Sequence, residues 1–405
     1  MSWEYVTLDK LGTISRGRSK HRPRNDKTLF GGKYPFVQTA DVKAAELYLT
    51  EYTDTYNERG LEQSKLWKAG TLCITIAANI ADTAILGIDA CFPDSIMGFI
   101  PYDGVSNVKF VKYAFDILQR DCQKISQGTA QDNLSWKKLS TIKFPAPPIE
   151  VQDRIVAILS VYDDLIENNK KKIKLLEEAA QRLYKEWFVD LRFPGYEDTP
   201  IVDGVPARWL MMPLSSVFEY VRGKSYTSKE LVEEGGVVMI NLKNIRAFGG
   251  YNRNAEKRYE GKFKENQELF AGDIVMGVTD MTKERRLVGH VAIVPNLDET
   301  MTFSMDLVKL VPLCVKKSFL YSTMFYGGYS KRISLLANGV NVLHLKPETM
   351  MNMEMLVPTE EIMEQYDILF DIYQRQIETL QKQCDIATEA RERLLPKLMS
   401  GEIEV

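Results

Sequence analysis

Cysteine and histidine are scarce in this sequence of 405 residues. The five cysteines are widely spaced and include no C-x-x-C pair, so we expect neither a disulfide framework nor a structural zinc site. The three histidines, His21, His290 and His344, are isolated from one another. Strand-like alternation around the last two favours packed or edge-strand residues over metal ligands or general bases.

Long apolar runs are also missing. No stretch approaches the roughly 18 residues that a membrane-spanning helix needs. The first residues, M-S-W-E-Y-V, lack the basic and then apolar organisation of a signal peptide. The hydrophobic fraction of 45% suits a folded chain rather than a disordered one. We therefore expect a cytoplasmic protein of two or three domains that does not bind a membrane.

The motifs of familiar catalytic chemistry are absent. Residues 12–19 nearly spell a phosphate-binding loop, but Arg18 stands where that motif needs lysine. Residues 223–225 supply the lysine, but Phe218 replaces the first glycine. There is no dinucleotide-binding glycine motif, no H-E-x-x-H, no nucleophile elbow and no N-P-P-Y or D-P-P-Y of amino-methyltransferases. The sequence predicts a protein that binds and does not catalyse, with no metal of its own.

The second half of the sequence repeats the first. Residues 3–8 align with 209–214, and R-G-R-S at 16–19 aligns with R-G-K-S at 222–225. Later matches keep the same order: 35–42 with 238–245, 69–72 with 271–274, Gly128 with Gly339, Leu134 with Leu345, and Pro147 with Pro358. A unit of about 150 residues followed by a helix of about 40 therefore occurs twice.

Two long helices are predicted, at 149–190 and at about 359–399, because apolar residues recur there every three or four positions. The first seam runs through Ile155, Leu159, Tyr162, Ile166, Ile173, Leu176, Ala180, Leu183 and Trp187, with Asn169 as its polar member. The second runs through Tyr366, Tyr373, Ile377, Leu380, Cys384, Ala387, Leu394 and Leu398. Matched lengths favour an antiparallel coiled coil roughly 50–60 Å long. The alternative is that each helix packs on its own domain.

Short strands with turns fill the segments between the helices. They are predicted at 34–37, 71–76, 84–88, 239–242, 273–278 and 288–294, with helices at 111–127 and 316–334. The expected fold class is α+β, with two pseudo-repeated α/β domains separated by two long antiparallel coiled-coil helices. The boundaries expected are a first domain at 1–148, a helix at 149–190, a linker and second domain at 191–357, and a second helix at 358–405.

Charge is distributed unevenly around a formal net charge of −3. The two helices carry more acidic than basic residues, and the remainder carries the reverse. One loop of the first domain collects Arg16, Arg18, Lys20, Arg22, Arg24 and Lys27, and a turn of the second collects Lys283, Arg285 and Arg286. Such clusters can neutralise phosphates, although a lone cluster is more often a solvated surface.

Four segments resemble a known family. They are 187–195 (W-F-V-D-L-R-F-P-G), 204–209 (G-V-P-A-R-W), 394–403 (L-L-P-K-L-M-S-G-E-I) and 147–152 (P-P-I-E-V-Q). All are similar to recurring segments of type I restriction–modification specificity subunits, and the resemblance extends over the whole chain. The second helix departs from the pattern, with Met363 where the first helix has Gln152.

The resemblance implies a specific function. Each domain, as a target-recognition domain, would read one half of a bipartite, gapped and asymmetric site in double-stranded DNA. The helices would act as a spacer and dock two modification (methyltransferase) subunits, and restriction/translocase subunits would join them. S-adenosylmethionine, ATP and Mg²⁺ would sit on those partners, and no cofactor on this chain. A coiled-coil protein whose repeats bind other proteins, and an enzyme with an unrecognised site, are the alternatives.

Candidate DNA contacts follow from position in the repeat. Phosphate contacts are expected from Arg16, Arg18, Lys20, Arg22, Arg222, Lys224, Arg285 and Arg286, with Ser19 and Ser225 beside them. Amide and acidic side chains suited to base edges are Gln38, Asp41, Gln131, Asn241, Asn244 and Asn341. For each of these, an ordinary role in a loop or turn is the alternative.

Overall fold

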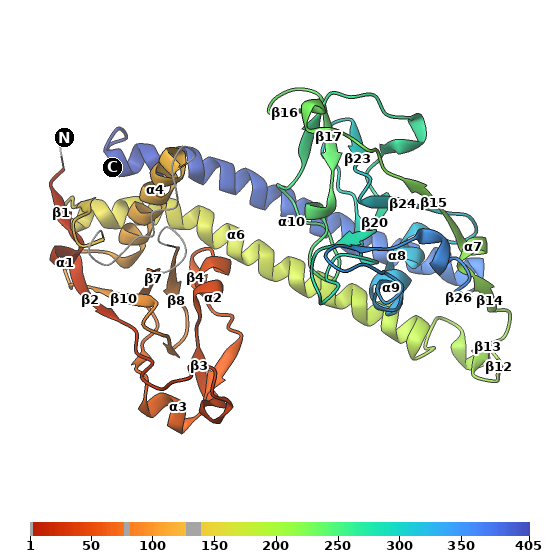
Figure 1. Ribbon diagram of the computed structural model, residues 1–405, viewed down its shortest axis with the longest axis horizontal. Helices are drawn as coiled ribbons and strands as arrows, with labels where there is room; N and C mark the ends of the chain where they lie inside the picture. The colour runs from red at the N-terminus through yellow and green to blue at the C-terminus, as the bar shows by residue number, and fades with distance from the viewer. Residues whose placement is uncertain (1–2, 77–81, 127–138) are drawn as a thin grey trace. The chain divides into compact units, whose positions relative to one another are not determined.

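The computed structural model describes residues 3–76, 82–126 and 139–405, with the side chains of 120–126 left undescribed (Figure 1). The chain forms two compact units. Unit 1 comprises Met1–Asn169 and Lys382–Val405, and unit 2 comprises Lys170–Gln381. Among the described helices none is both long enough and apolar enough to cross a membrane. The predicted Gln131 lies outside the described residues, as do Gly128 and Leu134.

Unit 1 is built on two sheets, with strand orders β2-β10-β7-β8-β4 and β5-β3-β9-β6, and a short pair β1-β11. The strands are β1 (Tyr5–Thr7), β2 (Gly12–Arg16), β3 (Phe30–Phe36), β4 (Tyr48–Leu49), β5 (Asp54–Tyr56), β6 (Leu66–Trp67), β7 (Leu72–Thr75), β8 (Thr83–Leu86), β9 (Ala90–Cys91), β10 (Ile96–Pro101) and β11 (Lys143–Pro145). The helices are α1 (Leu8–Leu11), η1 (Lys27–Leu29), α2 (Thr39–Ala44), α3 (Glu58–Glu62) and α4 (Val108–Ser126).

The core of unit 1 forms where α4 and the sheet of β7 and β10 meet the long helices. Phe99, Phe110 and Phe115 are fully buried there. Residues from the first turns of one long helix and the last turns of the other complete the same cluster, including Ile155 and Leu398. Each buried aromatic side chain stabilises the fold by about 1.5–3 kcal/mol through burial alone.

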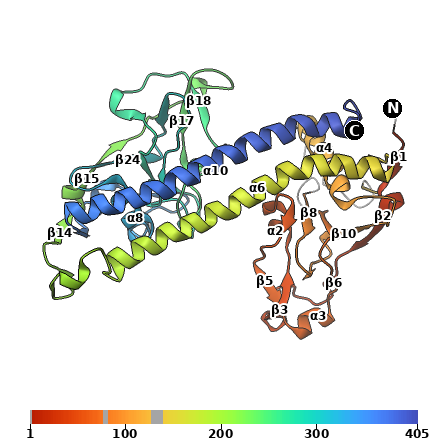
Figure 2. The same cartoon turned by 180° about the vertical axis from the view of Figure 1, so that it is seen from behind.

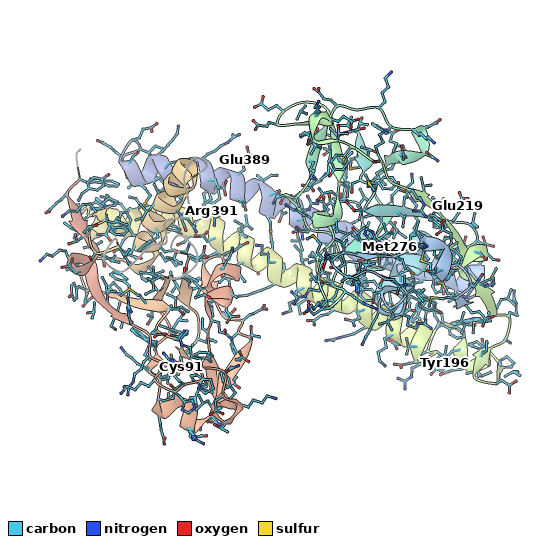
Figure 3. All side chains as sticks on the ribbon, in the orientation of Figure 1. Cys91, Tyr196, Glu219, Met276, Glu389 and Arg391 are labelled. Carbon is cyan, nitrogen blue, oxygen red and sulfur yellow. The ribbon has the colours of Figure 1, made fainter. Side chains whose placement is uncertain are left out.

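Unit 2 has corresponding sheets, ordered β15-β24-β20-β22 and β16-β18-β17-β23-β19, with the pairs β12-β13, β14-β26 and β21-β25. The strands are β12 (Ile201–Val202), β13 (Val205–Pro206), β14 (Leu210–Pro213), β15 (Phe218–Arg222), β16 (Leu231–Val232), β17 (Val237–Ile240), β18 (Lys257–Tyr259), β19 (Glu268–Leu269), β20 (Ile274–Gly277), β21 (Thr279–Asp280), β22 (Val291–Ile293), β23 (Met301–Phe303), β24 (Leu307–Pro312), β25 (Leu343–His344) and β26 (Glu354–Val357). The shorter helices are η3 (Tyr196–Asp198), α7 (Leu214–Val217), η4 (Ser228–Glu230), η5 (Leu242–Asn244), η6 (Glu265–Gln267), α8 (Lys317–Phe325), α9 (Tyr329–Ser334) and η7 (Pro347–Met350). Met276 of β20 lies buried in the middle of the unit 2 core (Figure 3).

Strand order confirms the repeat that the sequence predicts. The orders β2-β10-β7-β8 and β15-β24-β20-β22 match strand for strand, and so do β5-β3-β9-β6 and β18-β17-β23-β19. The one parallel neighbour pair inside the second sheet also recurs, as β3 with β9 and β17 with β23. Each predicted strand overlaps a strand of the structure. The stretch predicted at 316–334 is helical but forms two helices, because Gly328 adopts a positive φ of 76° and separates α8 from α9.

The two long helices are α6 (Ile149–Tyr184) and α10 (Glu360–Ser400). Within each unit their segments lie side by side and run in opposite directions (Figures 1 and 2). After Tyr184 the helix continues for one π-helical turn, Lys185–Val189 (η2), which covers most of the remaining predicted length. The antiparallel arrangement is therefore confirmed.

The helix-to-helix seam is shorter than the sequence predicts. Ile166 faces Cys384 and Ala387 in a small cluster of their own. The polar member, Asn169, donates from Nδ2 to Oε1 of Gln383 at 3.0 Å. The outer stretches of the seam pack on the domains instead: Leu159 on the unit 1 core, and Ala180 and Trp187 on the unit 2 core. The seam therefore packs on the other helix in its middle stretch and on the domains in its outer stretches.

Candidate nucleic-acid interface

The R-G-R-S and R-G-K-S segments are strand exits rather than nucleotide loops. Strands β2 and β15 end at Arg16 and Arg222, and the glycine that follows each lies against a crossing backbone. A Cβ on Gly17 would stand 2.3 Å from the oxygen of Pro93, and one on Gly223 would stand 2.0 Å from the oxygen of Ser304. Only glycine allows so close an approach, so the motif has a structural reason in both units.

The same crossing positions one basic residue identically in each unit. The backbone N–H of Arg18 donates to the carbonyl of Phe92 at 3.0 Å, and that of Lys224 donates to the carbonyl of Phe303 at 2.7 Å. Arg18 is exposed and Lys224 is half-buried. The repeat therefore presents a cation at the end of an equivalent strand twice.

The basic loop of unit 1 is partly held by its own contacts. Arg22 donates from Nη1 to the carbonyl of Ser19 at 2.7 Å, and Ser19 itself is buried. Arg22 also lies 3.7 Å from the carboxylate of Asp94, and Arg24 lies 2.5 Å from it. Exposed ion pairs of this kind contribute little stability, but they orient the loop. The side chains of Arg16, Arg18 and Lys20 are exposed along it.

A cavity of about 700 Å³ opens beside this loop in unit 1. Its lining combines cations, aromatic rings and hydrogen-bonding groups: Arg24, Asn25, Lys27, Phe30, Gly31, Phe36, Gln38, Thr39, Asp54, Pro93 and Ser95. Gln38 donates from Nε2 to Oδ2 of Asp54 at 2.7 Å. The structure thus brings the predicted Gln38 next to the basic loop. Sequence reasoning did not include Asn25 or Asp54, since nothing local distinguishes them from ordinary turn residues.

The matched pairs Gln38/Asp41 and Asn241/Asn244 have a shared structural role. The backbone N–H of Gln38 donates to Asp41 at 2.7 Å at the start of α2, and that of Asn241 donates to Oδ1 of Asn244 at 2.9 Å at the start of η5. These are the reciprocal bonds of a helix N-terminus. Asp41 also accepts from the hydroxyl of Thr53 at 2.8 Å.

The pair in unit 2, Asn241 and Asn244, is buried, whereas Gln38 of the pair in unit 1 is exposed. Asn244 is 0% exposed and donates to the carbonyl of Asn252 at 3.0 Å, and the buried Asn241 donates to the carbonyl of Ala255 at 2.7 Å. These two side chains hold the loop between β17 and β18, so their placement does not present them to a base edge. Gln38 is exposed and keeps that capacity. The sequence match reflected a common turn rather than a common contact.

The second basic loop, 281–287, is clamped by one carboxylate. Asp280 is buried and accepts backbone N–H groups from Thr282 at 2.7 Å, Leu287 at 2.6 Å and Val288 at 3.1 Å. Burial would raise the pKa of Asp280, but these backbone N–H groups outweigh burial and hold the pKa below its usual range. The loop is therefore fixed around an ionised carboxylate before any ligand arrives.

The pairing of β21 with β25 brings together the segments that carry three predicted DNA-contact residues. Arg285 and Arg286 follow β21, and Asn341 precedes β25, which pairs antiparallel with β21. Arg286 and Asn341 are exposed. Arg285, half-buried at a positive φ of 55°, donates to the carbonyl of Ser334 in α9 at 3.2 Å. Lys331 and Arg332 of α9 are exposed and thereby join the same basic surface, although sequence reasoning did not single them out.

Arg222 is held by an acidic neighbour. Its Nη2 lies 2.7 Å from Oε1 of Glu348, and the hydroxyl of Tyr220 donates to the same oxygen at 2.6 Å. The bond from Tyr220, with help from Arg222, lowers the pKa of Glu348 to about 2. Arg222 is thus partly neutralised, whereas Ser225, further along the same segment, is exposed. Among the described residues no group of three or more His, Cys, Asp or Glu forms a metal site.

Known proteins share both the sequence and the fold of this chain. Residues 1–178 match the family model of the type I restriction modification DNA specificity domain. The chain is 25% identical over 421 residues to the type I restriction enzyme MjaIX specificity subunit of Methanocaldococcus jannaschii, covering 100% of this chain and 94% of that protein. It is 26% identical over 203 residues to the EcoR124I/EcoR124II specificity subunit of Escherichia coli, covering 47% and 48% of the two chains.

A crystal structure supports the same fold. The S subunit of a type I restriction–modification system from M. genitalium superimposes with a TM-score of 0.55 at 16% identity, over 98% of this chain and 96% of that one. The likeness therefore includes both units and both long helices. With the duplicated strand order and the matched sequence domain, these comparisons show that the chain is similar to type I restriction–modification specificity subunits along its whole length.

Proposed function

We propose that this chain reads a bipartite, gapped and asymmetric site in double-stranded DNA, one half with each unit. The observation that carries the proposal is the duplicated strand exit, which presents Arg18 and Lys224 at equivalent positions of two equally folded domains. One chain with two different loops at equivalent places suits two unlike half-sites. The predicted boundaries, 1–148 and 191–357 for the readers, belong to this proposal.

We assign the phosphate contacts to basic side chains and the base contacts to exposed amides. In unit 1, Arg16, Arg18 and Lys20 would contact phosphates, because they are exposed on a loop held by its own hydrogen bonds. In unit 2, Lys224 and Arg286 would do the same. Phosphate contacts give affinity and register, whereas sequence is read at base edges. Gln38 and Asn341 are the exposed amides that the fold leaves near these cations.

The long helices carry a duplicated apolar surface. Exposed apolar residues on α6 recur on α10 at the same offset that relates Tyr162 to Tyr373: Ile158 with Leu369, Val161 with Ile372, and Leu175 with Ile386. Uncovered apolar surface of this kind marks an interaction site. Two equivalent copies support docking of two copies of one partner, which we propose to be two modification subunits.

The remaining partners and cofactors follow from the family. We propose that the modification subunits bind S-adenosylmethionine, that restriction/translocase subunits use ATP and Mg²⁺, and that this chain contributes no catalytic group and no cofactor. The helices α6 and α10 would set the gap in the DNA site, since each passes without interruption from one unit into the other.

Sequencing of methylated DNA tests the proposal. DNA is read by a single-molecule method from cells that express this chain, its modification subunit, or both. The expected result is a gapped, asymmetric methyladenine motif only when both are present. A soluble complex of the two that yields no motif would contradict the proposal, and a salt titration of DNA binding would then show whether the chain binds DNA at all.

A further inference from the structure

Phe248 combines an exposed ring with a backbone conformation that aromatic residues rarely adopt. Its side chain is 54% exposed, and its φ is +66°. A bulky residue in the left-handed region is strained, and such strain persists only where the surroundings enforce it. A phenylalanine that leaves more than half of its side chain exposed in a strained turn calls for a reason beyond packing.

The turn that carries Phe248 is held from several sides. The N–H of Phe248 donates to the carbonyl of Arg286 at 2.7 Å, and that of Gly250 donates to the carbonyl of Val291 at 2.8 Å. A Cβ on Gly249 would lie 2.6 Å from the ring of Phe325, so the turn packs tightly on α8. The Phe248 ring meets His290 edge-on, with centroids 5.7 Å apart. The backbone of the turn is therefore held in place, and the ring rests against His290.

Basic residues lie on the segments that adjoin this turn. Through its bond to Arg286, the turn adjoins the clamped loop 281–287, where Lys283 is also exposed. Arg285 joins that loop to α9, which adds Lys331 and Arg332. Acidic residues also lie nearby: Glu284 is 3.6 Å from Arg286, Glu177 is 2.8 Å from Arg246, and the buried Asp280 clamps the loop. The surroundings of the ring remain basic on balance. Met281, 79% exposed, is a second uncovered apolar side chain of the same loop.

We propose that Phe248 is a wedge that enters a base step of the half-site read by unit 2. A rigid apolar side chain can separate a pair of stacked base pairs when nearby cations neutralise the phosphates on either side. The cost of unstacking depends on the step, so the wedge adds selectivity without a hydrogen bond to any base. The wedge rests on the proposed DNA-reading function, and the basic surroundings favour DNA over a protein partner at this point.

Fluorescence of 2-aminopurine tests the wedge in the assembled complex of this chain with its modification subunits. Duplexes carry the methylation motif of the protein, with 2-aminopurine placed in turn along both halves. Unstacking brightens this base, so the wild-type complex is expected to brighten it at one step of one half. Phe248→Gly should abolish that signal and weaken binding of the motif about tenfold to a hundredfold, the range of one base-stacking contact.

Two further variants separate the wedge from a structural role. Glycine accepts a positive φ, so Phe248→Gly should keep the melting temperature of the protein, and Phe248→Leu should retain some of the signal. Phe270→Ala is the matched control, because Phe270 is 60% exposed and precedes β20, whereas the loop 281–287 that Phe248 contacts follows it. It should change neither binding nor fluorescence.

Several outcomes would overturn the wedge. The same bright position with Phe248→Gly as with wild type would do so, and so would tight wild-type binding with no bright position. A lowered melting temperature for Phe248→Gly would assign the ring to the fold. Intact DNA binding with poorer retention of the modification subunit would assign it to a protein interface. Failure of the wild-type complex to bind the motif would instead overturn the proposed function, and the wedge with it.

Discussion

Arg391 of α10, labelled in Figure 3, donates from Nη1 to Oδ1 of Asp163 of α6 at 2.6 Å inside unit 1. Tyr113 of α4 donates to the other oxygen of the same carboxylate. The Asp163 side chain is almost fully buried. Burial would lower the pKa of Arg391, but the adjacent Asp163 carboxylate outweighs burial and raises it. One carboxylate therefore joins three helices of the unit.

Removing the cation should destabilise unit 1 severely. Arg391→Met leaves the buried Asp163 carboxylate without its charge partner, which costs about 3–5 kcal/mol. Urea unfolding monitored by circular dichroism measures the loss. The double variant Asp163→Leu/Arg391→Met removes both charges and should recover most of the stability. A single variant as stable as wild type would show that the pair contributes nothing.

Acid should weaken unit 2 through His290. Burial lowers the pKa of His290, although the carbonyls of Phe248 and Arg285 oppose the shift. Because the folded-state pKa is lower, the unfolded chain binds more protons, so stability is full above the unfolded pKa of about 6.5 and falls below it. The slope is at most about 1.4 kcal/mol per pH unit. Melting between about pH 5.5 and 7.5 measures it, above the range where carboxylates titrate. His290→Gln should flatten this slope, and an unchanged slope would exclude His290 as its source.

Asn244 and Gln38 should respond oppositely to substitution. Asn244→Ala leaves the buried N–H groups of Asn241 without their acceptor and should cost about 1–3 kcal/mol, with the methylation motif unchanged. Gln38→Ala, at an exposed site, should alter the motif at one position and barely change stability. Thermal melting and sequencing of methylated DNA measure the two effects. A motif altered by Asn244→Ala in a fully folded protein would restore Asn244 as a base reader.

Substitution of Arg18 or Lys224 should lower the affinity for DNA without changing the preference for the motif. Each substitution to alanine removes one proposed phosphate contact and should reduce the slope of log affinity against log salt by about one. Fluorescence anisotropy over a salt series measures the slope for the motif and for unrelated DNA. Lys382→Ala, on α10, is the control and should leave the slope unchanged. An effect confined to the motif would instead indicate a base contact.

Helix length should determine the gap in the DNA site. Four residues, about one helical turn, are inserted into α6 near Asn169 and another four into α10 near Gln383. The two insertions face each other, so the helices stay paired. The methylation motif is expected to keep both halves and gain a longer gap. Sequencing of methylated DNA reads the result directly. An unchanged gap would show that α6 and α10 do not act as the spacer.

Local sequence patterns predicted some features of the fold and missed others. The helices α6 and α10 follow from uninterrupted apolar periodicity, and the repeat follows from matches such as Gly17 with Gly223, whose close backbone crossings admit no side chain. The break at Gly328 was not predictable, because a single glycine is tolerated in many helices. The buried state of Asn244 depends on Asn252 and the loop beyond it, which no local pattern reveals.

The site was only partly predictable for the same reason. The basic loops were visible as charge runs, and the pairing of β21 with β25 places Asn341 and Arg286 on segments that adjoin one strand pair. Phe248 left no signal, because its importance lies in a positive φ enforced by Arg286, far along the chain. Contacts between distant segments decided which side chains are exposed, and those contacts are not encoded in short windows of sequence.

Trp3 lies beside residues 401–405 in unit 1. A Cβ on Gly401 would lie 3.3 Å from the Trp3 ring, and Ile403 and Val405 pack on the same core as Trp3. Residues far apart in the sequence are thus close enough to be joined by a short linker. A circularly permuted protein, joined between residues 405 and 3 and reopened in the linker near Gly204, should fold and keep both units. The order of the two readers along the gene would then be a convention that the folded molecule does not need.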